Sequence, residues 1–158
     1  MKSEGLKTLL AAPFPAHHIH WRPGNTTRDK SKAIALAYLD SRDVQERLDD
    51  VCGIAGWQCA YPWSESGRLV CEIGINVDGE WIWKADGAGD GNFEAEKAAF
   101  SNAFKRCAVK WGIGRYLYDL PNKFVPLDNN RFSDETQREL TERLAAWQEK
   151  YFSKREAE

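Results

Sequence analysis

Apolar residues at every second position of 69–77 and again of 81–85, separated by Asp78-Gly79, constrain the fold more than any other feature. A period of two is that of a β-strand with one buried face. Asp-Gly between two such runs predicts a two-residue hairpin. Residues 57–63 alternate in the same way and precede the hairpin. We therefore predict an antiparallel meander in the middle of the chain.

The residues that follow predict one long amphipathic helix over 93–112, which Gly112 ends. Its apolar residues recur at helical spacing: Phe100, Ala103, Phe104, Cys107, Ala108 and Trp111. Because this spacing puts them on one side of the helix, that side is expected to pack on the sheet. The predicted fold class is α+β, an antiparallel three- to four-stranded β-meander packed against one long helix (a β-β-β-α core) with flanking helices.

The flanking segments carry shorter signals. Apolar spacing after Asp40 or Ser41, either of which can be the N-cap, predicts a short helix, and Ser133 caps a final amphipathic helix. Residues 33–39 fit a helix by alanine content and a strand by alternation, so periodicity does not decide between them. Residues 1–30 are punctuated by prolines and are expected to form an irregular arm with a lead-in strand at 19–22.

The basic residues are concentrated although the whole chain has a net charge of −2. No Asp or Glu occurs between residues 97 and 118, whereas this stretch contains Lys97, Lys105, Arg106, Lys110 and Arg115. On a helix they extend two polar rows, Lys97-Ser101-Lys105 and Asn102-Arg106-Lys110. With the apolar side on the sheet, these rows face solvent and indicate a surface for a polyanion. A solvated lysine-rich face and a contact between subunits are the alternatives.

Exposed aromatic side chains near the basic rows would indicate that the polyanion is a single-stranded nucleic acid, because its bases stack on aromatic rings beside a basic groove. Most aromatic residues of this chain stand at inward-facing strand or helix positions and are expected in the core. The surroundings of Tyr38, Tyr116 and Tyr118 are compatible with a place in such a groove.

Enzymatic and metal sites have weaker signals. The Gly87–Gly91 loop has a GxGxG pattern before a helix but lacks the Walker lysine and serine, so a flexible turn is the simpler interpretation. The loop could belong to a small nucleotide- or metal-dependent enzyme together with nearby acids, Asp86, Asp90, Glu94 and Glu96. His17, His18 and His20 lack partner ligands at metal spacing. We expect no cofactor, no metal and no catalytic residue.

Cysteine usage and hydropathy indicate the compartment. The cysteines, Cys52, Cys59, Cys71 and Cys107, lie in apolar patterns without CxxC spacing, which predicts buried thiols in a reducing cytoplasm. No apolar run is long enough to cross a membrane, and Pro13 and Pro15 interrupt the one that resembles a secretory signal. We expect a cytoplasmic protein.

Several segments resemble the Rad52/Rad22 family of DNA single-strand annealing proteins, and its bacterial DdrA and phage branches are the most similar. The specific signature is EKAAFSNAFKR within residues 89–108, which continues as WGIGRYLYDLP to Pro121. Supporting matches are YLDSR (38–42), Gly56-Trp57 and the early PFP…WR pattern. The resemblance covers residues 13 to 121.

The resemblance implies single-stranded DNA binding and ATP-independent annealing of complementary strands, in homologous recombination and double-strand break repair. It implies a homo-oligomeric ring or filament, with phage or host recombination proteins as further partners. Residues 31–128 would form the annealing core domain, between the arm (1–30) and the C-terminal helix (129–158).

Individual site residues follow from motif position. Lys105 and Arg106 resemble the family's groove residues, Tyr38 its groove tyrosine and Lys97 the lysine of an outer DNA contact, while Arg42 is a looser match. The basic rows add Lys110 and Arg115, so the expected DNA-binding set is Tyr38, Arg42, Lys97, Lys105, Arg106, Lys110 and Arg115.

Overall fold

The computed structural model describes residues 2–62, 68–87 and 96–157. The elements are α1 (Leu6–Ala11), β1 (His20–Thr26), β2 (Lys32–Tyr38), α2 (Ser41–Cys52), β3 (Trp57–Ala60), β4 (Val70–Val77), β5 (Glu80–Gly87), α3 (Glu96–Lys110), β6 (Phe124–Pro126) and α4 (Asp134–Glu156). They form two compact units, Met1–Ala12 with Ser41–Arg115, and Pro13–Asp40 with Tyr116–Glu158. The architecture is α+β, as predicted.

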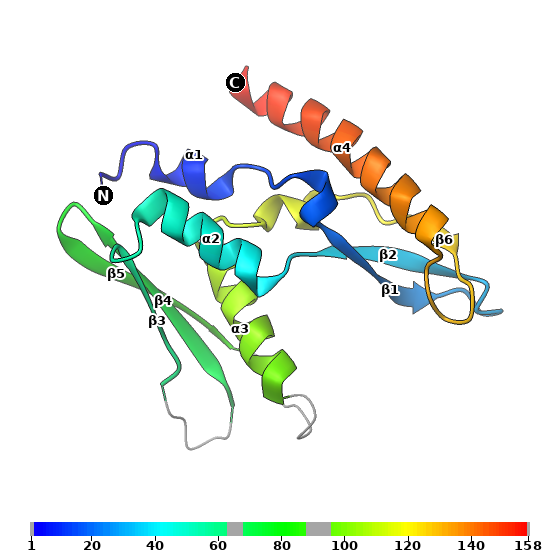
Figure 1. The fold of residues 1–158 in the computed structure, drawn as a ribbon, viewed down its shortest axis with the longest axis horizontal. Helices are drawn as coiled ribbons and strands as arrows, with labels where there is room; N and C mark the ends of the chain where they lie inside the picture. Colours follow the sequence, from blue (N-terminus) through cyan, green and yellow to red (C-terminus); the bar gives the residue numbers. More distant parts are fainter. Residues whose placement is uncertain (1, 63–67, 88–95, 158) are drawn as a thin grey trace. The chain divides into compact units, whose positions relative to one another are not determined.

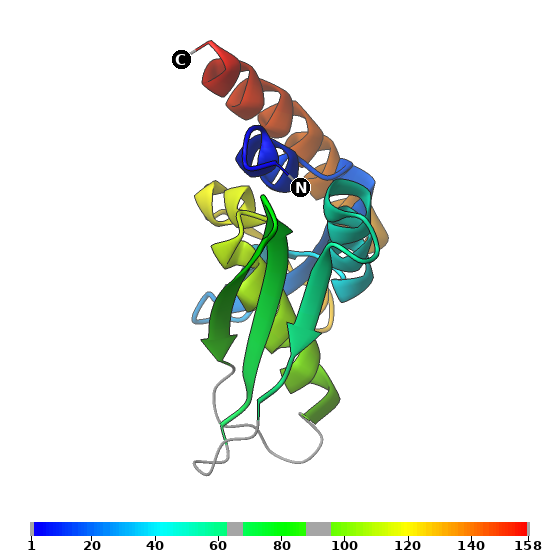
Figure 2. The same cartoon turned by 90° about the vertical axis from the view of Figure 1, so that its left-hand side faces the viewer.

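The first unit contains the predicted meander, an antiparallel sheet in the order β3-β4-β5 (Figures 1 and 2). Asp78 and Gly79 connect β4 to β5 and have φ values of 52° and 92°. Two consecutive positive φ angles are those of the turn that suits the twist of a hairpin. The alternation and the Asp-Gly pair therefore predicted both strands and their connection.

Helix α3 covers one face of this sheet and contacts β4 and β5, so the β-β-β-α core is confirmed (Figure 2). Its residues Ala103, Phe104, Cys107 and Ala108 are buried, as are Cys71, Ile73 and Ile75 of β4. Gly112 follows the helix with a φ of 94°. The first predicted residues of the helix, 93–95, lie outside the described residues.

Two further helices belong to this unit. The predicted helix is α2, which buries Val44 and Leu48. Helix α1 lies in the segment 1–30 that was expected to be irregular, and it can form there because the prolines of this segment all follow the helix. It buries Leu6 and Leu10, which are four residues apart and therefore on one side of the helix. The guanidinium of Arg47 on α2 donates hydrogen bonds to the carbonyls of Leu10 and Ala12 at 3.1 and 2.7 Å. These bonds satisfy carbonyls at the end of α1 and attach it to α2.

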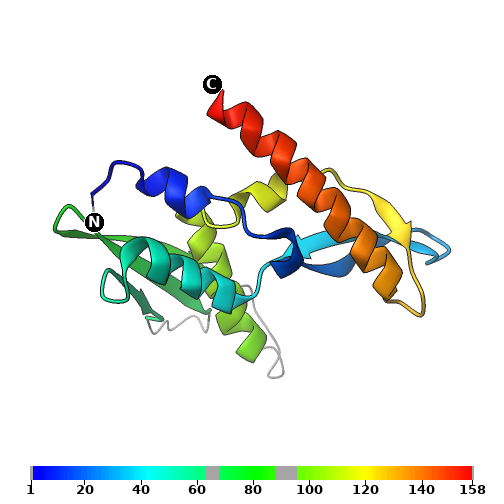
Figure 3. The same ribbon diagram turned by 45° about the horizontal axis from the view of Figure 1, so that its top comes forward.

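The second unit is a sheet in the order β1-β2-β6 with α4 across it (Figure 3). Residues 33–39, which fitted helix and strand equally, form most of the central strand β2. Ala33 is fully buried there in a cluster with Val125, Phe132 and Leu140. Long-range pairing therefore overrides the helix propensity of alanine. Ser133 caps α4 as predicted, because its side chain accepts a hydrogen bond from the Thr136 amide.

Two tryptophans correct the expectation that aromatic strand residues lie in the core. Trp81 and Trp83 are 38% and 43% exposed. Trp83 pairs with Gly74 across the hairpin, on the sheet face opposite the buried Ile73 and Ile75. An added Cβ at Gly74 would lie 2.7 Å from the Trp83 ring, so the indole rests on the glycine. Alternation predicted their common face but not which face α3 covers.

The cysteines also differ in part from expectation. Cys71 and Cys107 are buried and Cys52 is half-buried, but Cys59 is exposed. Cys59 lies on β3, an edge strand of the sheet, near the end of the strand. An apolar alternation therefore does not guarantee burial where only one neighbouring strand is present.

Candidate functional site

Helix α3 presents its basic residues on the sides that do not pack on the sheet. Lys105 is half-buried, and Arg106 and Lys110 are exposed. The next residues in sequence, Cys107 and Ala108, point into the core. Lys97 lies in the first turn of α3, and its side chain is outside the described part of the structure. The predicted separation between an apolar and a basic side is present from Ala103 to Lys110, whereas Phe100, which was expected on the buried side, is 43% exposed.

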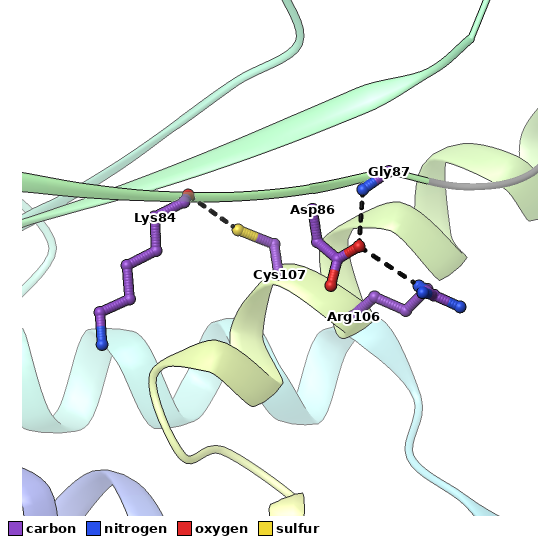
Figure 4. Close-up of polar contacts among 5 residues, drawn as sticks. All are labelled: Lys84, Asp86, Gly87, Arg106 and Cys107. Carbon is purple, nitrogen blue, oxygen red and sulfur yellow. Dashed lines mark hydrogen bonds and ion pairs between the residues drawn. The ribbon is translucent and has the colours of Figure 1, made fainter.

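Arg106 has an acidic neighbour that the sequence analysis did not pair with it. Its Nε lies 3.5 Å from Oδ1 of Asp86 at the end of β5 (Figure 4). The same oxygen accepts a hydrogen bond from the Gly87 amide at 2.7 Å. The Arg106 side chain is 60% exposed, and exposed ion pairs contribute about 0–1 kcal/mol. Arg106 also has N–H donors on its Nη atoms, so a phosphate can compete for the guanidinium.

Arg115 lies at the C-terminal end of α3. Its Nη2 donates hydrogen bonds to the carbonyls of Val109 and Lys110 at 2.7 and 3.0 Å. Its Nε donates a further bond to Val109 at 3.0 Å. A cation at this position satisfies terminal carbonyls and interacts favourably with the helix dipole. Arg115 therefore has a structural role at the helix end, and a DNA contact through it stays a prediction.

Lys84 on β5 is a further cation at the C-terminal end of α3, and no sequence motif indicated it. Its Nζ donates to the Lys110 carbonyl at 3.0 Å and lies 4.4 Å from the ring centre of Trp111. The register pairs Lys84 with the buried Ile73, so Lys84 shares the sheet face that α3 covers. The period of two along 81–85 places Lys84 on the face opposite Trp81 and Trp83, but it does not indicate which face α3 covers. Lys84, Lys110 and Arg115 thus bring three cations to one helix end.

Arg42 and Tyr38 come from other elements. Arg42 lies in the first turn of α2 and is exposed. Tyr38 belongs to the second unit, where it ends β2. Its ring is 36% exposed and lies 5.3 Å from the His20 ring, centroid to centroid. An exposed ring held by a neighbouring ring provides a surface on which a base can stack.

Tyr116 and Tyr118, the other two tyrosines considered for a groove, have different surroundings. Tyr118 is 73% exposed. Tyr116 is only 3% exposed, and its hydroxyl accepts a hydrogen bond from the Phe14 amide and donates one to Gln148 Oε1. Its ring packs against Trp147 and Phe152. The interpretation of Tyr116 as a groove residue is therefore wrong, because its hydroxyl and ring are used inside the second unit.

The alternative sites receive no structural support from the described residues. Within 2–62, 68–87 and 96–157, no three His, Cys, Asp or Glu side chains are grouped so that they could hold a metal ion. Residues 88–95, which include most of the glycine loop and the acids Asp90 and Glu94, lie outside the described residues. Across the described chain, no helix is both long and apolar enough to span a membrane.

Comparison with known proteins identifies the family. The model of the Rad52/22 family, described as double-strand break repair proteins, matches residues 2–65 and 63–136. The chain belongs to the Rad52/22 family. One relative is the single-stranded DNA-binding protein DdrA of Deinococcus deserti, to which the chain is 42% identical over 146 residues. The aligned segment covers 90% of this chain and 71% of the relative.

A second relative is the single-stranded DNA-binding protein DdrA of Deinococcus radiodurans. It is 38% identical over 151 residues, 90% of this chain and 68% of the relative. The resemblance to the family and to its DdrA branch is therefore confirmed. The descriptions of the family and its relatives specify double-strand break repair and single-stranded DNA binding. They favour the DNA-binding hypothesis over the alternative enzyme based on the Gly87–Gly91 loop.

Proposed function

We propose that this protein binds single-stranded DNA along the outward sides of α3 and anneals complementary strands without ATP, in double-strand break repair by recombination. Two relatives named for single-stranded DNA binding support the choice of ligand. The observation that carries the location is the division of α3 into a side buried on the sheet and sides that bear Lys105, Arg106 and Lys110.

The proposed mechanism is electrostatic positioning. Each cation that meets a phosphate releases a counterion from the strand, which favours binding in a salt-dependent way. Fifteen residues of α3 extend over about 22 Å at about 1.5 Å per residue, enough for several phosphates of a single strand. A strand held by its backbone keeps its bases available for pairing with a second strand.

The residues proposed to contact the strand are Arg42, Lys97, Lys105, Arg106, Lys110 and Arg115 of the first unit and Tyr38 of the second unit. We assign the phosphate contacts to the cations and base stacking to Tyr38. Annealing needs many such sites in register, and we propose that a homo-oligomer, a ring or a filament, supplies them. Native mass spectrometry of the full chain, with and without an oligonucleotide, checks the oligomer.

Salt dependence tests the binding mode. A fluorescently labelled single strand is titrated with the full chain at several salt concentrations, and anisotropy gives the binding constant. With three or four phosphate contacts per subunit, the logarithm of the constant falls with the logarithm of salt with a slope of about −2 to −3. A slope near zero contradicts the proposal.

A double variant tests the location. Lys105→Ala/Arg106→Ala is expected to lose binding and annealing while its circular dichroism spectrum stays native. The matched control, Lys150→Ala/Lys154→Ala, removes the same charge from exposed positions of α4 and is expected to bind like the parent. Equal losses in both variants would mean that overall charge, rather than α3, holds the strand.

A further inference from the structure

Three cysteine sulfurs follow one another from the sheet edge into the core of the first unit. Cys59 on β3 and Cys71 on β4 have their sulfurs 3.5 Å apart. Cys107 on α3 is the next thiol and lies near enough to Cys71 to influence its pKa. Cys107 in turn donates to the Lys84 carbonyl at 3.0 Å (Figure 4). This row of thiols has no part in the proposed DNA interface.

Its two ends differ in access and in acidity. Cys59 is exposed, whereas Cys71 and Cys107 are buried. A hydrogen bond from the Cys71 thiol lowers the pKa of Cys59 to about 7. The neighbouring Cys107 and Cys59 thiols, together with burial, raise the pKa of Cys71. Near neutral pH, the outermost sulfur is therefore a thiolate in part, and its neighbour is the protonated donor.

We propose that Cys59 and Cys71 are a peroxide-sensitive pair, in which Cys59 reacts with hydrogen peroxide and Cys71 then closes a disulfide between β3 and β4. The pair is distinct from a single reactive cysteine because the second sulfur is already in contact with the first. Access for the oxidant comes from the exposure of Cys59 at the edge of the sheet.

The reaction balances with peroxide as the oxidant. The Cys59 thiolate attacks one peroxide oxygen, an S–O bond forms, the O–O bond breaks, and the departing hydroxide takes a proton to become water. Cys59 is then a sulfenic acid. The Cys71 sulfur attacks the Cys59 sulfur, an S–S bond forms, the S–O bond breaks, and the hydroxyl leaves as water with the Cys71 proton. One peroxide yields one disulfide and two waters.

The strand arrangement permits the bond if the edge strand β3 shifts. Cys59 pairs directly with Ile73, so Cys71 is its diagonal neighbour on the same sheet face. The sulfurs must approach from 3.5 Å to about 2.0 Å. Cys59 is one residue from the end of a four-residue edge strand, where few hydrogen bonds resist a shift. The movement therefore falls on β3 rather than on the central strand β4.

Mass spectrometry tests the product. The full chain is treated with hydrogen peroxide, remaining thiols are alkylated, and the protein is digested with trypsin. Cys52 shares the tryptic peptide 48–68 with Cys59, so the experiment uses the Cys52→Ser background. The expected product joins peptides 48–68 and 69–84, with a loss of about 2 Da that dithiothreitol reverses. A link to peptide 107–110, a link between two chains, or only overoxidised Cys59 would overturn the proposal.

Two variants test the order of events. Cys59→Ser, a change at an exposed position, is expected to slow thiol loss about tenfold, whereas Cys52→Ser alone leaves the rate unchanged. The parent rate should rise with pH, reach half its maximum near pH 7 and level off about one pH unit higher, following the Cys59 thiolate. In Cys71→Ala, dimedone should trap a sulfenic acid at Cys59. If this core variant fails to fold, Cys59→Ser and the pH profile decide, and an unchanged rate in Cys59→Ser contradicts the proposal.

Discussion

Asp86 at the end of β5 faces Arg106 on α3, with 3.5 Å between Oδ1 and Nε. The stretch 97–118 excludes acids, so the carboxylate that meets Arg106 comes from a strand instead. Asp86 is also fixed by the Gly87 amide, which donates to the same oxygen. A bound phosphate would replace Asp86 as the anion beside Arg106, and the two anions would repel each other. Asp86 is therefore expected to oppose DNA binding.

Removing this carboxylate should strengthen binding. In Asp86→Asn the side-chain oxygen for the Gly87 amide remains, but the negative charge is lost. Affinity for a labelled single strand should rise about two- to threefold at about 50 mM salt, as the loss of a weak exposed ion pair allows. Anisotropy titrations measure the change.

Glu80→Gln provides the control because it removes the same charge from the same strand. Glu80 lies six residues from Asp86, about 20 Å along β5, beyond the screening length of about 14 Å at 50 mM salt. Its affinity should stay at the parent value. If both variants gain equally, net charge alone explains the effect and Arg106 has no special contact.

Substitutions of Arg115 distinguish its contribution to the stability of the fold from its contribution to DNA binding. Arg115→Ala removes three hydrogen bonds to the last carbonyls of α3 and is expected to lower the free energy of unfolding by about 1–2 kcal/mol. If Arg115 also meets a phosphate, the salt slope becomes shallower by about 0.7. Arg115→Lys keeps the charge and loses the planar fork, so its stability should fall while its slope stays. Urea unfolding and salt titration measure the two effects, and a parent slope in Arg115→Ala would leave only the structural role.

Tyr38 tests base stacking in the second unit. Tyr38→Ala should weaken single-strand binding about tenfold, whereas Tyr38→Phe keeps the ring and should bind like the parent. Phe124→Ala, at a more exposed aromatic position of the same unit, is the control and should change affinity little. A native circular dichroism spectrum excludes unfolding as the cause of weaker binding. Equal weakening in Tyr38→Phe would assign the role to the hydroxyl and contradict stacking.

Local patterns predicted the first unit well because its pairings are close in sequence. The Asp78-Gly79 turn fixes the β4–β5 register, and the helical spacing from Ala103 to Ala108 defines the buried side of α3. The second sheet was harder, because β6 pairs with β2 across almost ninety residues of chain (Ile34 with Phe124). No local signal encodes such a pairing, and Ala33 to Leu39 stayed ambiguous without it.

Within the candidate site, too, the residues placed by local spacing were predicted and those placed by contacts between elements were not. The basic rows of α3 were visible from spacing alone, since a helix brings residues four apart to one side. Asp86 and Lys84 were not assigned, because their relation to α3 depends on which sheet face the helix covers. Arg115 was predicted as a cation but not as a partner of helix carbonyls, since that contact requires the chain to turn back after Gly112.

The effect of Gly74→Ala on the free energy of unfolding should depend on Trp83, because the Trp83 ring lies directly against Gly74. Alanine in place of a strand glycine is ordinarily favourable by about 0.5–1 kcal/mol, because it reduces the freedom of the unfolded chain. Here the added Cβ would lie 2.7 Å from the Trp83 ring, so Gly74→Ala should instead lower the free energy of unfolding by about 1–3 kcal/mol. In the Trp83→Ala background the obstacle is gone, and the same substitution should become neutral or stabilising. Urea unfolding of the two single variants, the double variant and the parent gives the coupling energy. A Gly74→Ala effect that is the same in both backgrounds would mean that the indole does not rest on the glycine in solution.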